Sequence, residues 1–130
     1  MIFLLAKMGY AFASIFFLYG ISHRQRNLVH HQRAMALGYA VVTLITLVVL
    51  ASTLSNPDPR GIPIIVERLA GVELGHQIQN VHLWVALVSY LLLTAQVGSG
   101  RLRLTWHKPL ARVTGPLWVA VFITGLFLYG

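Results

Sequence analysis

The segment AMALGYAVVTLITLVVLASTLSN (residues 34–56) contains no charged side chain and is predominantly apolar. It exceeds the roughly 20 apolar residues that an α-helix needs to cross the ~30 Å hydrocarbon core of a bilayer. A helix that is apolar on all sides is typical of a protein core or of a membrane. An uncharged run of this length therefore predicts a transmembrane helix.

Three further segments have the same character. Residues 74–100 and 113–130 are uncharged, and residues 1–20 carry only Lys7. Of the 130 residues 57% are hydrophobic and 10% are charged, whereas about 25% are charged in soluble domains. The sequence therefore predicts an all-α fold, an integral membrane four-helix bundle that forms a single domain over residues 1–130. We expect helices at about residues 1–20, 31–54, 76–98 and 109–130.

Seven of the ten basic residues lie in or beside the two short connections between the predicted helices: Arg24, Arg26, Arg33, Arg101, Arg103, Lys108 and Arg112. The long connection, residues 55–76, holds all three acidic residues. Because short basic loops stay in the cytoplasm, we expect both termini on the outer (periplasmic or lumenal) side. Anionic lipids, and no nucleic acid, are then the expected partners of the basic loops. The expected location is a bacterial inner (plasma) membrane or a thylakoid-type membrane.

Few side chains within the predicted spans can perform chemistry. The chain has no cysteine, which excludes thiolate metal sites and iron–sulfur clusters. The acidic residues Asp58, Glu67 and Glu73 lie outside the spans, so no pair of carboxylates is available within the membrane. We therefore expect a protein that is not an enzyme, and histidine is the remaining candidate for a functional group.

The histidines lie near the ends of the predicted helices. Four lie at the cytoplasmic rim: His23, His30, His31 and His107. Two lie at the outer rim: His76 and His82. Two imidazoles from different helices at one depth are what bis-histidine coordination of a b-type haem requires. His31 and His107 lie at the ends of two separate helices and meet this condition. We therefore predict that they are the axial ligands of a haem iron.

Small residues follow both predicted ligands on the same helical face. Gly38 follows the first histidine, and Ala111 and Gly115 follow the second. These positions would leave room for a flat macrocycle. The propionates of the haem would pair with arginines at the same rim: Arg33, Arg101 or Arg103.

Other interpretations of the histidines stay open. Histidines near an interface can be plain polar anchors, and another metal such as copper, or the magnesium of chlorophyll, could replace haem iron. His30 is a less favoured ligand because Met35 and Gly38 share the face of His31. His82 is expected to face inward as a neutral, hydrogen-bonded side chain, and a second haem bound by His82 and Met8 is an alternative.

The C-terminal residues carry a resemblance to a known family. The patterns H-x3-A-x2-T-x-P-x-W and TG-x3-Y, which run from His107 to Tyr129, resemble the last helix of a small four-helix bacterial membrane family. That family includes a maturation factor for cytochrome c oxidase. The H-x3-M of His31 and Met35, and His82 before LWVA, are similar to the same family. HHQR at residues 30–33 is also similar to a related cyanobacterial and plastid four-helix family of unknown function.

The resemblance implies a function in electron-transfer complexes. We expect a small haem-associated membrane protein that assists the assembly of a respiratory or photosynthetic complex, or serves in it as an accessory subunit. The alternatives are a purely structural or pigment-binding subunit and a quinone-linked membrane cytochrome. Members of the family commonly have a further histidine at the outer end of the second helix, where this chain has Ser52 and Thr53.

Overall fold

The computed structural model describes residues 2–55 and 71–128, which form four long α-helices. These are α1 (Ile2–His23), α2 (Leu28–Ser55), α4 (Val72–Arg101) and α5 (His107–Leu128). All four are long and apolar enough to cross a membrane. The predicted all-α class is therefore confirmed for the described residues, and the helices indicate a multi-pass membrane protein.

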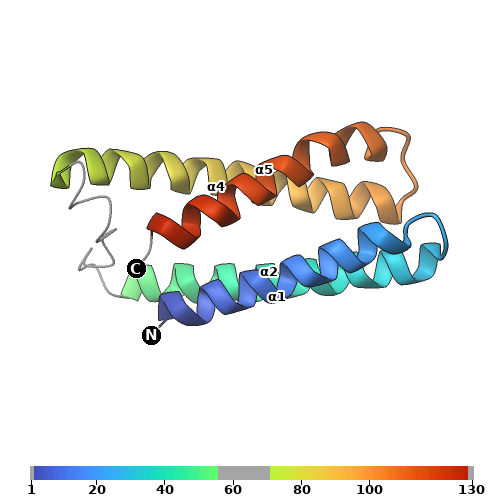
Figure 1. The fold of residues 1–130 in the computed structure, drawn as a ribbon, viewed down its shortest axis with the longest axis horizontal. Helices are drawn as coiled ribbons and strands as arrows, with labels where there is room; N and C mark the ends of the chain where they lie inside the picture. Colours follow the sequence, from blue (N-terminus) through green and yellow to red (C-terminus); the bar gives the residue numbers. More distant parts are fainter. Residues whose placement is uncertain (1, 56–70, 129–130) are drawn as a thin grey trace.

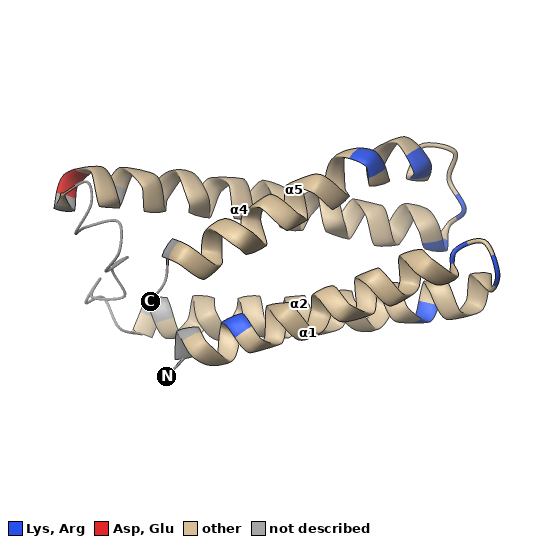
Figure 2. Ribbon diagram, in the orientation of Figure 1, with Lys and Arg blue, Asp and Glu red and all other residues tan. Residues whose placement is uncertain are grey.

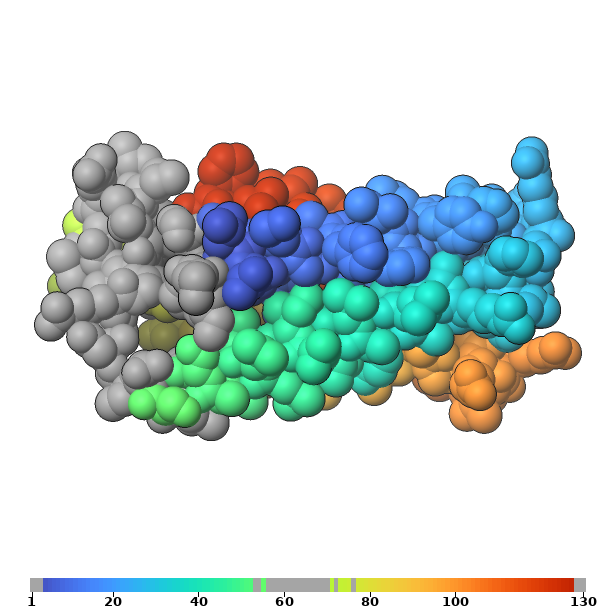
Figure 3. All heavy atoms as spheres, turned by 90° about the horizontal axis from the view of Figure 1, so that it is seen from below, coloured from blue at the N-terminus to red at the C-terminus, as the bar shows by residue number. Residues whose placement is uncertain are grey.

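The helices form two antiparallel hairpins that lie side by side (Figure 1). In one hairpin α1 packs against α2, and in the other α4 packs against α5, whereas the hairpins touch each other more sparsely, mainly through α2 and α4. Figure 3 shows α1 and α2 lying against each other along their length. Both short turns lie at one end of the bundle, and the start of α1 and the end of α5 lie toward the other.

Large apolar side chains cover the outside of all four helices, for example Leu18, Leu44, Trp84 and Phe127, each of which is exposed. So much exposed apolar surface is unfavourable in water. It is compatible with hydrocarbon, in which helices satisfy their backbone hydrogen bonds internally. The surface therefore agrees with the four candidate spans.

A small apolar core joins the hairpins, centred on the buried side chains of Ala13, Phe17, Val42 and Leu93. The indole of Trp118 in α5 packs edge-on against the ring of Phe17 in α1, with the ring centres 5.5 Å apart. Its Nε1–H donates a hydrogen bond of 3.2 Å to the hydroxyl of Ser14. One aromatic side chain thus ties α5 to α1 through both packing and a polar contact.

Four hydroxyl groups join α2 to α4, and we call this cluster the hydroxyl clasp: Tyr39, Thr43, Tyr90 and Thr94. The rings of Tyr39 and Tyr90 stack with their centres 5.9 Å apart. The Tyr39 hydroxyl lies 3.0 Å from that of Thr94, and the Tyr90 hydroxyl lies 3.0 Å from that of Thr43. Hydrogen bonds between membrane helices contribute about 0.6 kcal/mol each. The clasp therefore determines which parts of the two hairpins meet, and it adds little to the stability of their association.

The first helices extend further than predicted. α1 runs through Gly20 to His23, and α2 begins at Leu28 instead of residue 31. Asn27 is the reason for the earlier start, because its side-chain oxygen accepts hydrogen bonds from the backbone N–H groups of Val29 and His30. This arrangement satisfies donors that the first turn of a helix leaves free.

The third helix also extends beyond its predicted end at residue 98, because α4 continues through Gly98 and Gly100 to Arg101. The helix then closes with paired bonds, from the backbone N–H of Leu104 to the carbonyl of Ser99 and from that of Arg103 to the carbonyl of Gly100. This is a Schellman motif. Its left-handed position is held by Arg103 at a φ of 55°, and not by either glycine.

Helix α5 contains two prolines with different effects. Pro109 lies in the first turn of the helix, where a missing N–H costs nothing. Pro116 lies inside the helix, and Figure 1 shows that α5 changes direction part-way along its length. A bend of this kind follows from the hydrogen bond that an internal proline cannot make.

Gly38 offers a test of the packing between α1 and α2. A Cβ at Gly38 would lie 2.6 Å from Cε1 of Phe17 and 3.2 Å from the carbonyl oxygen of Ala13. We expect Gly38→Ala to lower the free energy of unfolding by about 1–3 kcal/mol through overpacking. Thermal unfolding in detergent measures the effect. Gly98→Ala, whose Cβ would meet nothing within 4 Å, is the control and should be neutral or stabilising. Equal unfolding temperatures for the two variants would contradict this account of the packing.

Candidate metal centre

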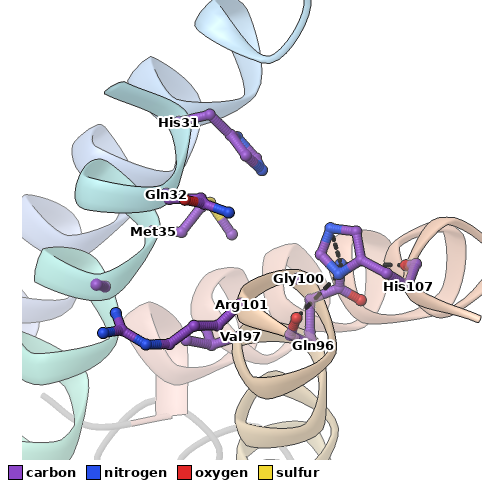
Figure 4. A pocket seen from close by; sticks show the side chains of 9 residues that line it. His31, Gln32, Met35, Gln96, Val97, Gly100, Arg101 and His107 are labelled. Carbon is purple, nitrogen blue, oxygen red and sulfur yellow. Dashed lines mark hydrogen bonds between the residues drawn. The ribbon is translucent and has the colours of Figure 1, made fainter. Parts of the chain in front are cut away.

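His31 and His107 face each other across the seam between the two hairpins. His31 lies in the first turn of α2 and His107 is the first residue of α5. Their ring centres are 6.5 Å apart and their planes are inclined by 75°. Figure 4 shows the two imidazoles pointing toward one another from the two helices. The structure therefore brings together the two histidines that the sequence predicts as partners.

The imidazole of His31 is anchored to the neighbouring helix. Its Nδ1–H donates a hydrogen bond of 2.7 Å to the carbonyl oxygen of Gly20, and the side chain is only 8% exposed. A carbonyl accepts but cannot donate, so the proton is on Nδ1 and the lone pair is on Nε2. Metal-binding histidines are held in this way, with one nitrogen on a backbone carbonyl and the other free for the metal.

His107 is anchored in an equivalent way by α4. Its Nδ1 lies 3.0 Å from the carbonyl oxygen of Gln96 and 3.0 Å from the hydroxyl of Ser99. The Ser99 hydroxyl donates to the same carbonyl at 3.0 Å. Two oxygen acceptors around Nδ1 favour the proton on that atom, which leaves the lone pair on Nε2. The amide nitrogen of Gln96, 3.3 Å from this Nε2, can donate to it.

A small cavity of about 40 Å³ lies between the two imidazoles. Its lining comes from the first turns of α2, the last turns of α4 and the start of α5: His31, Gln32, Met35, Ala36, Gln96, Val97, Gly100, Arg101 and His107. One water molecule needs about 10–15 Å³ of cavity volume. The cavity therefore has room for a metal ion or a water molecule, but not for a porphyrin.

The glycines predicted to make the macrocycle slot do not line this cavity. Gly38 packs against Phe17 of α1, so the ring of Phe17 takes the space that the glycine leaves. A Cβ at Gly115 would meet nothing within 4 Å, and this residue is also absent from the cavity lining. Neither glycine lines the cavity, so a macrocycle slot formed by Gly38 and Gly115 stays a prediction.

Gly100 and Gln96 are site residues that the sequence analysis missed. A Cβ at Gly100 would lie 2.6 Å from Cε1 of His107, so only glycine lets α4 approach this ring so closely. Gln96 lies one turn earlier on the same face of α4 and contacts the same imidazole. A signal was present, because a short turn before His107 places the last turn of the preceding helix beside it.

The other predicted histidines lie apart from this pair. His30 is exposed and stacks at 6.4 Å on His23 at the rim. Nδ1 of His82 lies 3.1 Å from the hydroxyl of Thr124 in α5, as expected for a hydrogen-bonded side chain. Met8, the second ligand of the alternative haem, is 63% exposed.

The electrostatic surroundings of the pair are basic. Figure 2 shows that the described lysines and arginines gather at the end with the two turns, apart from one at the start of α1, whereas an acidic residue lies at the other end. Arg101 lines the cavity, and it is exposed, as are Arg33 and Arg103. Within residues 2–55 and 71–128, no group of three His, Asp or Glu side chains could hold a metal ion. A metal here would need donors of other kinds.

No protein-family model, curated protein or solved structure matches this chain.

Gly100 provides a test of how His107 is positioned. We expect Gly100→Ala to push the imidazole away from α4, and thereby to break its hydrogen bond to the carbonyl of Gln96. In NMR spectra of protein labelled at histidine, the Nδ1 and Nε2 shifts of His107 should change. Gly98→Ala, two residues away with an unhindered Cβ, should leave them in place. If the His107 shifts respond equally to both substitutions, the close approach at Gly100 is not what fixes the ring.

Proposed function

We propose that this protein is a small multi-pass membrane protein that holds a metal centre between His31 and His107. In this role it would assist the assembly of a respiratory or photosynthetic electron-transfer complex, or serve there as an accessory subunit. The observation that carries the proposal is the opposed pair of imidazoles, each with Nδ1 on a backbone carbonyl. An Nε2 that carries the lone pair can bind a metal, and on His107 the ion would take the place of the Gln96 amide N–H. The resemblance to the oxidase maturation family supports the cellular role.

Haem b is the cofactor expected from the sequence, and the site fits it only in part. The two imidazoles match the axial ligands of a b-type haem, and Arg101 is placed to meet a propionate. When bound, a haem would supply a one-electron redox centre. The cavity of about 40 Å³ does not admit the macrocycle while the hairpins are in contact. The same objection applies to chlorophyll, whereas copper needs no such space.

The charge distribution supports an orientation in the membrane. The basic end of the bundle, with both turns, would face the cytoplasm, and both termini would lie on the outer side. At that depth the arginines would meet the anionic lipid headgroups of the inner leaflet, each contact contributing about 1 kcal/mol. A bacterial inner membrane or a thylakoid-type membrane has the required arrangement.

Histidine substitutions test the metal centre. Protein purified in mild detergent should contain metal in proportion to chain, as measured by elemental analysis and by a reduced-minus-oxidised spectrum. We expect His31→Ala and His107→Ala each to lose that metal, because one imidazole alone cannot hold it. His23→Ala, which removes a histidine at the same rim, is the control and should retain it. The proposal fails if both single variants keep the metal content of the parent.

Single cysteines test the orientation, because the chain has no thiol of its own. Ser22 lies near the α1–α2 turn and Ser55 ends α2, and both are exposed. In intact cells, a membrane-impermeant maleimide should label Ser55→Cys and not Ser22→Cys. After the cells are broken open, both variants should react. Labelling of Ser22→Cys in intact cells would reverse the proposed orientation.

A further inference from the structure

We propose that the cavity between the hairpins is a copper(I) site, with His31, His107 and Met35 as ligands and Gln96 as a supporting acceptor. This inference rests on the proposed metal centre and names its metal. It replaces the haem that the sequence favours with a bare ion.

The size of the cavity is the first argument. A volume of about 40 Å³ suits one ion or one water molecule. The ring centres are 6.5 Å apart. Two imidazoles that bind one ion from opposite sides, with metal–nitrogen bonds of about 2.0 Å, have ring centres roughly 6 Å apart. The observed spacing is therefore compatible with a single ion shared by the two rings.

The third donor is a thioether. Met35 lines the cavity and lies one turn after His31, on the same face of α2. Its sulfur packs close to Gly20, the residue whose carbonyl anchors His31. The side chain has three rotatable bonds, which let the sulfur turn toward an ion. Thioethers are soft ligands that select copper(I) over harder cations, and imidazole also suits copper.

The charge around the cavity favours a cation of low charge. Arg101 lines the cavity, and the other described basic side chains at this end of the bundle lie in or beside the two turns. In the described part of the chain the acidic residue is Glu73, at the start of α4 and at the far end of the bundle (Figure 2). A doubly charged zinc ion would meet this repulsion without a compensating carboxylate and without four nitrogen or sulfur ligands. Copper(I) carries one positive charge and accepts fewer ligands.

The side chain of Gln96 is an independent indication that the cavity holds a polar or charged ligand. This side chain is only 4% exposed, and its amide oxygen has no hydrogen-bond partner among the described residues. Buried acceptors are almost always paired. Because Gln96 lines the same cavity, its oxygen can act as a weak fourth donor to the ion, or accept a hydrogen bond from a water molecule bound to it.

The test is a titration of the purified full-length protein with copper(I), under anaerobic and reducing conditions, against a chromogenic copper(I) chelator. We expect one copper(I) ion per chain and no binding to His31→Ala or His107→Ala. Gln96→Leu should weaken binding by roughly tenfold or more, as changes around metal ligands do. Met35→Leu should weaken it at least as much and should remove the sulfur contribution from the X-ray absorption spectrum. Met8→Leu, which changes an exposed methionine, is the matched control. Thermal unfolding confirms that each variant is folded.

Each result bears on one of the two proposals. If Met35→Leu binds copper(I) as tightly as Met8→Leu does, or if zinc competes equally with copper(I), the copper(I) site is wrong. If the parent purifies with haem, and that haem is lost in His31→Ala and His107→Ala, the metal centre stands but its assignment to copper(I) falls. If neither histidine variant changes any bound metal or haem, the proposed function itself fails.

Discussion

A polar group inside hydrocarbon must find its hydrogen-bond partner within the protein, and most features of this bundle follow from that constraint. Serine and threonine hydroxyls donate to carbonyls one turn earlier in their own helices, as Ser14 and Thr114 do. Helix α4 continues through two glycines until its carbonyls can be capped at the rim. The imidazoles of His31 and His107 obey the same rule, since each has one nitrogen held by a carbonyl of the adjacent helix.

The two helices within each hairpin contact each other more extensively than the two hairpins do. Small residues let the helices of one hairpin approach closely, as Gly38 does against Phe17. Between the hairpins, the contacts are the hydroxyl clasp, a small apolar core and the indole of Trp118. The cavity lies in this less extensive interface, directly beyond the clasp toward the basic end. The geometry of the metal centre therefore depends on the seam more than on either hairpin alone.

The sequence was sufficient for the number of helices, because uncharged runs of about 20 residues have few other interpretations. It also placed His31 and His107 at one depth, since both lie next to short basic turns. It could not assign the partners of each glycine, because neighbours on a helix differ by about 100° in direction and only packing fixes the rotation. Gly38 shares the face of His31, but the ring of Phe17 from α1 fills the space beside it, a contact that only the packed structure reveals. The predicted end of the third helix at residue 98 was also too early, because the helix continues through Gly100, which makes room for an imidazole.

The anchoring of the two histidines divides the centre into halves. The carbonyl that holds His31 belongs to α1 and the ring to α2, whereas the carbonyl that holds His107 belongs to α4 and the ring to α5. Each hairpin thus carries one complete ligand together with its support. A metal ion bound by both histidines would link the two hairpins, as a metal at a subunit interface links two chains, although here both sides belong to one polypeptide. Its binding energy would count directly toward the docking of one hairpin on the other.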